Sequence, residues 1–404
     1  MTTCCILGLG YIGLPTAAVL ARSGHRVVGV DVNSEVVATV NQGQIHIVEP
    51  DLDRAVADAV ASAALSAQST PVPADVFLIA VPTPFSSRAD GIPQPNIDYV
   101  LAAARAIAPV LRPGNLVLLE STSPVGTTEK VVEEMSKIAN LDFDHIHVAY
   151  CPERVLPGRI LQELISNDRV IGGFTSAAAE AGKAFYATFC QGELLTTSAR
   201  TAELVKLTEN SFRDVNIAFA NELSLVCNHL EINVRELIRL ANHHPRVNVL
   251  QPGCGVGGHC IAVDPWFIAA AAPHCTPLIQ TSRHVNDGKG RWVIEQVQAR
   301  AAALEDKLGR TARVGCLGLS FKPDVDDLRE SPALHITTEL LVAGLDVLAC
   351  EPNLHDHPTI KLHSLQQVLA KADLLVFLVA HTPFRNLDLG GRTVFDLCGV
   401  TEQA

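Results

Sequence analysis

Cys260 is the side chain in this sequence whose type and setting best suit covalent chemistry. It follows a glycine-dense stretch from Gly253 to Gly258 and precedes the helical run IAVDPWF. A backbone rich in glycine lets a ligand come close to the thiol. A thiol that attacks an aldehyde gives a hemithioacetal, which can lose a hydride to an acceptor and leave a thioester for water to cleave. We therefore predict that Cys260 is a nucleophile.

A metal site is the main alternative for this region, because several cysteine and histidine side chains lie close together in the sequence. They are Cys254, His259, Cys260, His243 and His244. Their spacing matches none of the common zinc patterns. The thioester chemistry needs no metal ion, and we predict that the protein holds none.

Three polar residues upstream are spaced so that they share one face of a helix. Lys206, Asn210 and Arg213 fall at positions i, i+4 and i+7. A lysine and an amide beside a reactive thiol could accept a hydroxyl proton and hold a water molecule or an oxyanion. A solvated polar stripe is the alternative. It is disfavoured because a separate, neighbouring face is apolar, with Leu204, Leu207, Phe212 and Ile217.

The first strand-like run ends in a glycine pattern typical of dinucleotide binding. Gly8, Gly10 and Gly13 form GxGxxG, with Tyr11 and Ile12 between the last two glycines and a helix-like run after them. Gly8 permits a tight turn, Gly10 lets a pyrophosphate approach the backbone, and Gly13 lets the helix contact the sheet. A phosphate would then lie at the helix N-terminus. A tight turn without a ligand is the alternative.

An acidic residue ends the next strand-like run, HRVVGVD. Asp31 lies 18 residues after Gly13, where a carboxylate accepts hydrogen bonds from the adenosine ribose hydroxyls and repels a 2′-phosphate. This pattern predicts NAD rather than NADP as the cofactor. Asp31 could instead cap the following helix, although Asn33 or Ser34 is available for that role.

Two further strand ends carry hydroxyl groups, in the segments VPTP and ESTSPVG. Thr83 and Thr122 lie there, at the carboxyl edge where open α/β sheets bind their ligands. We predict that they line the nicotinamide half of the cofactor site. Either residue could instead be a turn residue that satisfies its own backbone.

The elements that must position these residues change in type along the chain. Over the first half, apolar strand-like runs alternate with alanine-rich helical stretches, which predicts a parallel, doubly wound sheet. A long helical pattern begins near Thr201, and the strand pattern returns near Arg313. We therefore expect an α/β protein in which two Rossmann-like parallel-sheet domains are joined by a helical middle domain with a long central helix. The expected domains are residues 1–200, 201–307 and 308–404.

The composition limits the classes of partner. The 404 residues include 31 Lys and Arg against 43 Asp and Glu, a formal charge of −12, which argues against nucleic acid or an anionic membrane. Eleven cysteines without CxxC spacing indicate a reducing compartment. The sequence has no apolar run of about 20 residues, and its first residues, MTTCCILGLG, lack the basic region and cleavage site typical of a signal peptide. We therefore expect a cytoplasmic protein.

Several stretches of the sequence are those of one known family. The chain resembles the UDP-glucose/GDP-mannose dehydrogenase family over nearly its whole length, in GLGYIGLPTA, AVPTPF, ESTSPVGTTEK, AYCPERVLPG, TAELVKLTENSFRDVNIAFANELSL, GVGGHCIAVDPWF and FKPDVDDLRESPA. The resemblance implies an N-terminal NAD domain, a helical middle that forms a homodimer interface, and a C-terminal domain for the nucleotide of a UDP-sugar. It also implies a four-electron oxidation that uses two NAD per turnover.

The resemblance also implies roles for individual residues. Cys260 is similar to the family nucleophile, Lys206 to its catalytic lysine, Asn210 to the asparagine partner, and Asp264 to the aspartate that assists water and proton handling. Arg329 resembles a residue that contacts the cofactor. Arg246 would reach across the dimer. The substrate contacts implied in this way are Lys206, Asn210, Arg154, Val155, Arg213, His244, Arg246, Gly257, Phe321 and Lys322.

Departures from the UDP-glucose branch indicate the substrate. Val263 stands where that branch carries lysine, and Pro157 stands where it carries a second glutamate, four residues after Glu153. The base that activates the hydrolytic water is therefore unassigned. His259 and the run CIAVDPWF resemble the branch that oxidises N-acetylated amino sugars. The resemblance thus implies oxidation of UDP-N-acetyl-D-mannosamine at C6 to the uronate, for surface polysaccharide synthesis.

Other functions remain as alternatives. Within the family, the substrate could be UDP-N-acetylglucosamine or UDP-glucose. A two-electron hydroxyacid dehydrogenase would need neither Cys260 nor a third domain, and the segment RVGCLGLSFKPD argues against it. An NAD-sensing binding protein would need no nucleophile, so the presence of both Lys206 and Cys260 argues against that class.

Overall fold

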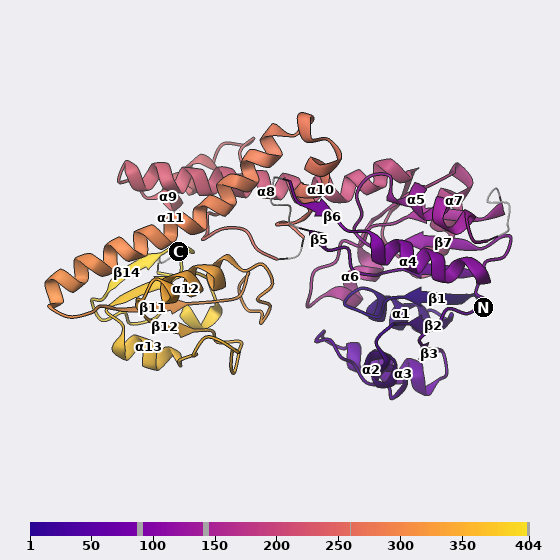
Figure 1. Cartoon of the computed structure of the whole chain (residues 1–404), viewed down its shortest axis with the longest axis horizontal. Helices are drawn as coiled ribbons and strands as arrows, with labels where there is room; N and C mark the ends of the chain where they lie inside the picture. The colour runs from indigo at the N-terminus through magenta and orange to yellow at the C-terminus, as the bar shows by residue number, and fades with distance from the viewer. Residues whose placement is uncertain (87–91, 140–144, 259, 402–404) are drawn as a thin grey trace. The chain divides into compact units, whose positions relative to one another are not determined.

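The computed structural model describes residues 1–86, 92–139, 145–258 and 260–401, and the chain divides into two compact units (Figure 1). Unit 1 comprises Met1–Thr208 and Trp266–Pro273, and unit 2 comprises Glu209–Pro265 and His274–Ala404. The division into three domains stays a prediction. In the part of the chain that is described, no helix is both long and apolar enough to cross a membrane.

An eight-stranded sheet of order β10-β9-β8-β7-β4-β1-β2-β3 forms the centre of unit 1. Six of its strands, from β8 to β3 in this order, are parallel, whereas β9 pairs antiparallel with β8. A separate antiparallel pair joins β5 to β6. The strands are β1 (Thr3–Leu7), β2 (Arg26–Val30), β3 (Leu65–Gln68), β4 (Val76–Ile79), β5 (Phe85–Ser86), β6 (Gln94–Pro95), β7 (Leu116–Leu119), β8 (His147–Tyr150), β9 (Arg169–Gly173) and β10 (Leu194–Ser198).

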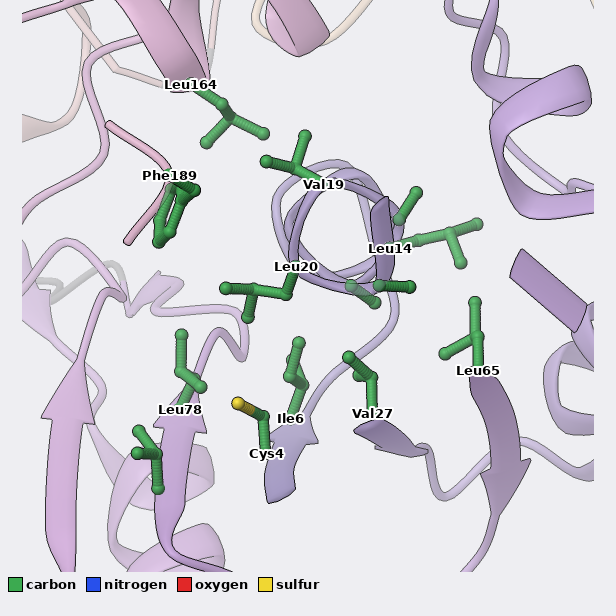
Figure 2. Packing of buried hydrophobic residues seen from close by; sticks show 14 of the residues in the cluster. Cys4, Ile6, Leu14, Val19, Leu20, Val27, Leu65, Leu78, Leu164 and Phe189 are labelled. Carbon is green, nitrogen blue, oxygen red and sulfur yellow. The ribbon is translucent and has the colours of Figure 1, made fainter. Parts of the chain in front are cut away.

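The central strands are continuous apolar runs because helices cover both faces of the sheet. All residues of β4 (VFLI) and β7 (LVLL) are buried, as parallel sheets between helical layers require. One layer of the core lies under α1, where Leu14 and Leu20 pack over Ile6, Val27 and other strand residues (Figure 2). The helices of this unit are α1 (Gly13–Arg22), α2 (Ser34–Asn41), α3 (Leu52–Ala61), α4 (Asp98–Ile107), the 3₁₀ turn η1 (Ala108–Val110), α5 (Thr127–Ser136), α6 (Ile160–Ser166) and α7 (Ser176–Tyr186).

Long helices connect the sheets. The longest are α8 (Ala199–His229) and α11 (Pro277–Leu308), and α8 belongs to unit 1 up to Thr208 and to unit 2 after it. Shorter helices lie between them in the chain, namely α9 (Val234–Ala241), α10 (Asp264–Ala271) and η3 (Pro273–Cys275). The long helix that the sequence predicts from Thr201 is therefore present.

Unit 2 contains a second parallel sheet of order β12-β11-β13-β14. Apolar residues of β11 and β13 are buried between α11 and α12 on one side and α13 on the other. The elements are β11 (Arg313–Leu317), α12 (Pro332–Val342), β12 (Asp346–Cys350), α13 (Leu365–Lys371), β13 (Leu374–Phe377), η4 (Thr382–Phe384) and β14 (Thr393–Asp396).

The predicted α/β class, with two Rossmann-like sheets and a helical middle region, is confirmed. The expectation of a parallel first sheet was incomplete, because β9 and β10 run opposite to the six other strands. These strands and β3 were not predicted. The connection between β8 and β9 contains only the seven-residue helix α6, and the chain re-enters the sheet from the carboxyl edge of β8.

Candidate active site

The glycine-rich turn after β1 has the geometry that its sequence predicts. Gly8 has a φ of +90°, and a Cβ there would lie 2.5 Å from the carbonyl oxygen of Ala80. A Cβ on Gly13 would lie 1.8 Å from the carbonyl oxygen of Gly8, so the helix meets the turn only if this residue is glycine. Around Gly10, by contrast, no described atom lies within 4 Å of such a Cβ. Two glycines are thus required by packing, and Gly10 leaves space for a ligand.

The start of α1 is suited to an anion. The N-cap residue Ile12 makes no side-chain capping hydrogen bond to this helix, whose first residue is Gly13. Tyr11 is exposed and Ile12 is half-buried in the turn. Backbone N–H groups and the helix dipole at such an end favour a phosphate. The residues present therefore fit the pyrophosphate of a dinucleotide.

Asp31 is held against the same turn. Its carboxylate accepts hydrogen bonds from the backbone N–H of Leu9 (2.9 Å) and of Asn33 (2.9 Å). Asn33, not Asp31, caps α2, since its side chain accepts from the N–H of Glu35. The capping alternative for Asp31 is therefore wrong. A half-buried carboxylate fixed at the end of β2 can face the ribose of a dinucleotide.

The side chain of Ser121 links the ends of β4 and β7 by hydrogen bonds. No role for this residue was predicted from the sequence. The Ser121 hydroxyl accepts from the N–H of Val81 (2.9 Å) and donates to its carbonyl oxygen (2.7 Å). The hydroxyls of the half-buried Thr83 and Thr122, on the same two segments, have no hydrogen-bond partner among the described residues. Neither threonine hydroxyl satisfies its own backbone, so both remain candidates for ligand contact.

Lys206 lies one helical turn after a buried carboxylate. Glu203 of α8 accepts from the N–H of Gly126 (2.6 Å), and from the N–H (2.7 Å) and hydroxyl (2.7 Å) of Thr128. It therefore caps α5, and burial raises its pKa. This contact joins α8 to the segment that follows Thr122, and Lys206 is itself buried.

The loop between β8 and α6 contains Arg154 and Val155, and carboxylates hold it by hydrogen bonds. Glu153 accepts from the N–H of Arg154 (2.8 Å) and from the guanidinium of Arg169 (3.2 Å). Farther along, Glu49 accepts from two backbone N–H groups, those of residues 158 (2.8 Å) and 160 (2.7 Å). Arg154 also donates to the carbonyl oxygen of residue 168. The loop is thus fixed although it contains no regular structure.

A buried acid lies under this edge of the sheet. Glu120, directly after β7, accepts a hydrogen bond from the Tyr186 hydroxyl (2.7 Å), while its second oxygen has no partner in the described structure. The guanidinium of Arg169 packs 4.7 Å from the Tyr186 ring centroid. Burial raises the pKa of Glu120 to about 7, with nearby Arg169 opposing the rise.

In unit 2, the region around Cys260 contains a buried asparagine and aspartate. The side-chain amide of Asn210 donates to the Asp264 carboxylate at 2.5 Å. The N–H of Asp264 donates to the carbonyl oxygen of Cys260 (2.8 Å), so a single turn joins the cysteine to the helix α10, which begins at Asp264. Cys260 is half-buried, whereas burial raises the pKa of the Cys254 thiol to about 12. Burial therefore disfavours Cys254 as a nucleophile.

The glycines before Cys260 pack against the segment that follows β11. A Cβ on Gly257 would lie 2.4 Å from the carbonyl oxygen of Glu330, and one on Gly258 would lie 2.9 Å from the Phe321 ring. The N–H of Gly258 donates to the carbonyl oxygen of Arg329 (3.2 Å). The structure therefore brings together Gly257, Phe321 and the backbone of Arg329, all predicted as site residues.

The side chains of the other predicted site residues in unit 2 are half-buried or exposed. Lys322 is half-buried, with its ammonium 5.8 Å from the Phe321 ring centroid, and the Arg329 side chain pairs with Asp327 (2.6 Å). His244, Arg246 and Arg213 are exposed.

The loop that bears His244 and Arg246 is closed by an asparagine that sequence reasoning did not identify. Asn242 accepts from the N–H of Val249 (2.7 Å) and donates to its carbonyl oxygen (3.0 Å). Within unit 2, hydrogen bonds thus link Asn210 to Asp264 and Asp264 to Cys260, whereas no hydrogen bond or ion pair among the described residues joins Arg213, His244 or Arg246 to them. Lys206 and Asn210 share α8 but belong to different units. His259 lies outside the described residues.

Comparison with known proteins matches three domain models of one family to this chain. They are described as the NAD binding domain (residues 2–190), the central domain (residues 200–288) and the UDP binding domain (residues 315–403) of the UDP-glucose/GDP-mannose dehydrogenase family. The chain belongs to the UDP-glucose/GDP-mannose dehydrogenase family. NAD is therefore the cofactor, as predicted, and a UDP-sugar is the substrate class.

Individual members of this family are similar to the chain over almost their whole length. The chain is 54% identical to the UDP-N-acetyl-D-mannosamine dehydrogenase of Escherichia coli K12, over 95% of this chain and 94% of that protein. It is 52% identical to the NDP-N-acetyl-D-galactosaminuronic acid dehydrogenase of Ralstonia nicotianae, over 98% and 96% respectively. The structure of the UDP-N-acetyl-mannosamine dehydrogenase from S. aureus has a TM-score of 0.90 at 41% identity, covering 100% of this chain and 96% of that chain. The protein is thus an NAD-dependent nucleotide-sugar dehydrogenase.

Proposed function

We propose that the protein oxidises UDP-N-acetyl-D-mannosamine at C6 to UDP-N-acetyl-D-mannosaminuronate, a precursor for surface polysaccharide. The observation that carries this proposal is the 54% identity, over 95% of the chain, to a protein named UDP-N-acetyl-D-mannosamine dehydrogenase. The overall reaction converts the CH₂OH group, two NAD⁺ and one water to a carboxylate, two NADH and three protons. Both oxidations are completed on one sugar before product leaves.

Lys206 is proposed to act in the first oxidation and Cys260 in the second. Lys206 accepts the C6 hydroxyl proton as the alcohol becomes an aldehyde, and bound NAD supplies the hydride acceptor at each oxidation. The Cys260 thiolate then attacks the aldehyde carbon and forms a carbon–sulfur bond, giving a hemithioacetal. Loss of the second hydride leaves a thioester on the sulfur.

Water cleaves the thioester and releases Cys260. Asp264 is proposed to assist this step, because its backbone is hydrogen-bonded to Cys260 and its carboxylate is oriented by Asn210. Pro157 stands where a second glutamate of the UDP-glucose branch is expected, so no base on that loop is assigned to the water. The hydrogen bond between Asn210 and Asp264, which the sequence did not predict, supports the proposal that both residues act at one site.

The substrate contacts that we propose are those that the family resemblance implies. Arg154, Val155 and Lys206 come from unit 1, and the cofactor contacts proposed there are Gly8, Gly10, Tyr11, Ile12, Gly13, Asp31, Thr83 and Thr122. Lys322 and Arg246 supply the positive charge that the UDP pyrophosphate needs, since the chain as a whole is acidic. The other contacts proposed from unit 2 are Asn210, Arg213, His244, Gly257 and Phe321, and Arg329 is proposed to contact the cofactor.

We also propose a homodimer formed through α8. Phe212, Phe219 and Val226 are exposed at seven-residue spacing along this helix, with exposed fractions of 68%, 54% and 46%. An apolar stripe of this length on one helix is typical of a helix–helix interface. Arg246 would then act in the partner's site. A cytoplasmic location stays a prediction.

A galacto-configured substrate is the second candidate, because the chain is 52% identical to a protein named NDP-N-acetyl-D-galactosaminuronic acid dehydrogenase. A panel of UDP-sugars, assayed for NADH and uronate together, separates the candidates. We expect the highest kcat/KM with UDP-N-acetyl-D-mannosamine, lower values with the N-acetylgalactosamine, N-acetylglucosamine and glucose analogues, and two NADH per uronate. A ratio of one NADH per sugar would contradict the four-electron reaction, and a preference for another sugar would contradict the substrate.

A further inference from the structure

Two asparagines of α8 hold the two ends of the segment that carries Cys260. Asn210 donates to the carboxylate of Asp264, at the downstream end. Asn221 accepts from the backbone N–H of Gly253 (2.9 Å), at the upstream end. The proposed chemistry uses Asn210 but gives Asn221 no role.

The two asparagines point to the same side of the helix. They are eleven residues apart, which is about 20° more than three full turns at 100° per residue. The rise between them is about 16 Å. One face of a rigid helix therefore provides two fixed points for the segment from Gly253 to Asp264.

Asn221 is itself held in one orientation by a buried network. Its amide nitrogen donates to the Asn286 oxygen (2.9 Å), and Asn286 in turn donates to the Asp214 carboxylate (2.8 Å). Arg283 also donates to this carboxylate, at 2.7 Å. The exposed fractions of Asn221, Asn286 and Asp214 are 0%, 1% and 0%. Because Asn286 accepts with its oxygen and donates with its nitrogen, the Asn221 oxygen must face Gly253.

The anchored segment needs such constraints more than ordinary loops do. Four of its first six residues are glycine, and glycine loses more backbone entropy on ordering than any other residue. Gly255 and Gly258 have φ values of +144° and +83°. A loop of this composition has many alternative conformations unless its ends are fixed.

We infer that Asn221 is a positioning residue for the nucleophile: by accepting the Gly253 N–H it fixes the start of the glycine-rich segment that carries Cys260. The inference rests on the proposed function of Cys260. In this inference Asn221 contacts neither substrate nor cofactor. It acts on the reaction by keeping the segment that carries Cys260 in one conformation.

The test compares Asn221→Ala with the control Asn115→Ala in the full-length protein. Asn115 is similarly buried and also joins backbone groups, accepting from the N–H of Arg112 (2.7 Å) and donating to the carbonyl oxygen of Ala74 (2.8 Å), but it lies in unit 1. Loss of a buried hydrogen bond changes an opening equilibrium about 5- to 150-fold. We expect Asn221→Ala to speed amide exchange of residues 253–258 by about tenfold or more and to lower kcat about tenfold, with KM for NAD changed less than about twofold.

The control should lower the unfolding midpoint without these effects. If Asn221→Ala does not fold, Asn221→Ser, whose side chain is one heavy atom shorter, is measured instead and should accelerate exchange of residues 253–258 in the same way. Unchanged exchange in the folded Asn221 variant, or equal acceleration in Asn115→Ala, would overturn the inference. Failure of the proposed function is read separately, from uronate formation by Cys260→Ser, which does not affect the exchange measurement.

Discussion

Replacing the buried Glu120 by glutamine is predicted to make the protein more stable at high pH. Burial raises the pKa of Glu120 from 4.5 to about 7, so the folded protein binds a proton there that the unfolded chain releases above pH 4.5. The stabilising effect of this proton is full below pH 4.5 and is lost as the pH rises through about 7. At 1.36 kcal/mol per pKa unit, this rise in pKa sets an upper limit of about 3 kcal/mol on the pH-dependent contribution of Glu120 to the free energy of unfolding.

The magnitude is measured as a difference between two proteins. The free energy of unfolding of wild type and of Glu120→Gln is measured with urea from pH 5 to pH 8.5. In the difference between the two values, the contributions of titrating groups that both proteins share cancel. The variant should gain stability relative to wild type as the pH rises, by up to about 3 kcal/mol. An exposed glutamate on α7, the helix that carries Tyr186, supplies the control Glu180→Gln, which should show no such trend. A difference for Glu120→Gln that is independent of pH, or that falls with pH, would refute the reasoning.

Three further predictions concern the site itself. Wild type should prefer NAD over NADP. Asp31→Ala should raise KM for NAD about tenfold and reduce this preference, because charge-assisted hydrogen bonds to the cofactor are lost. The control Asn33→Ala, which removes only a helix cap, should leave the cofactor preference unchanged. Lys322→Ala should weaken UDP-sugar binding about tenfold in calorimetry while NAD binding stays near normal, and unchanged affinity would contradict the placement of the nucleotide. Gly257→Ala should destabilise by about 1–3 kcal/mol, because its Cβ would meet a carbonyl oxygen at 2.4 Å, whereas Gly253→Ala, whose nearest contact is 3.9 Å, should be tolerated in thermal unfolding.

Local patterns in the sequence were sufficient for much of the fold. Apolar runs predicted β1, β4 and β11, and three- and four-residue periodicity predicted α8, because these signals depend only on neighbouring residues. The glycine pattern at the start of α1 was likewise predictable, because Gly8 and Gly13 are required by packing and Gly10 leaves space for a ligand. The reversed direction of β9 was not predicted, because the direction of a strand depends on a connection whose course leaves no periodic signal.

The side chains that hold the loops of the candidate site by hydrogen bonds could not be predicted in the same way. Glu49 and Glu203 bond to backbone groups more than 70 residues away, and Asn221 bonds to Gly253 across 32 residues. A single glutamate or asparagine has many possible partners, and only the folded chain selects among them. The side chains proposed for chemistry were predicted, whereas the ones that hold their loops became visible only in the structure.

Covalent catalysis at Cys260 is the central claim, and the measurement that tests it most directly is product analysis of Cys260→Ser. Serine is a weak nucleophile without a dedicated base, so the thioester route is closed to this variant. Wild type and Cys260→Ser are mixed rapidly with UDP-N-acetyl-D-mannosamine and NAD, and the products and the protein are analysed by mass. We predict two NADH per uronate for wild type and no net uronate from Cys260→Ser. Release of the uronate by Cys260→Ser at the wild-type rate would contradict covalent catalysis at this residue.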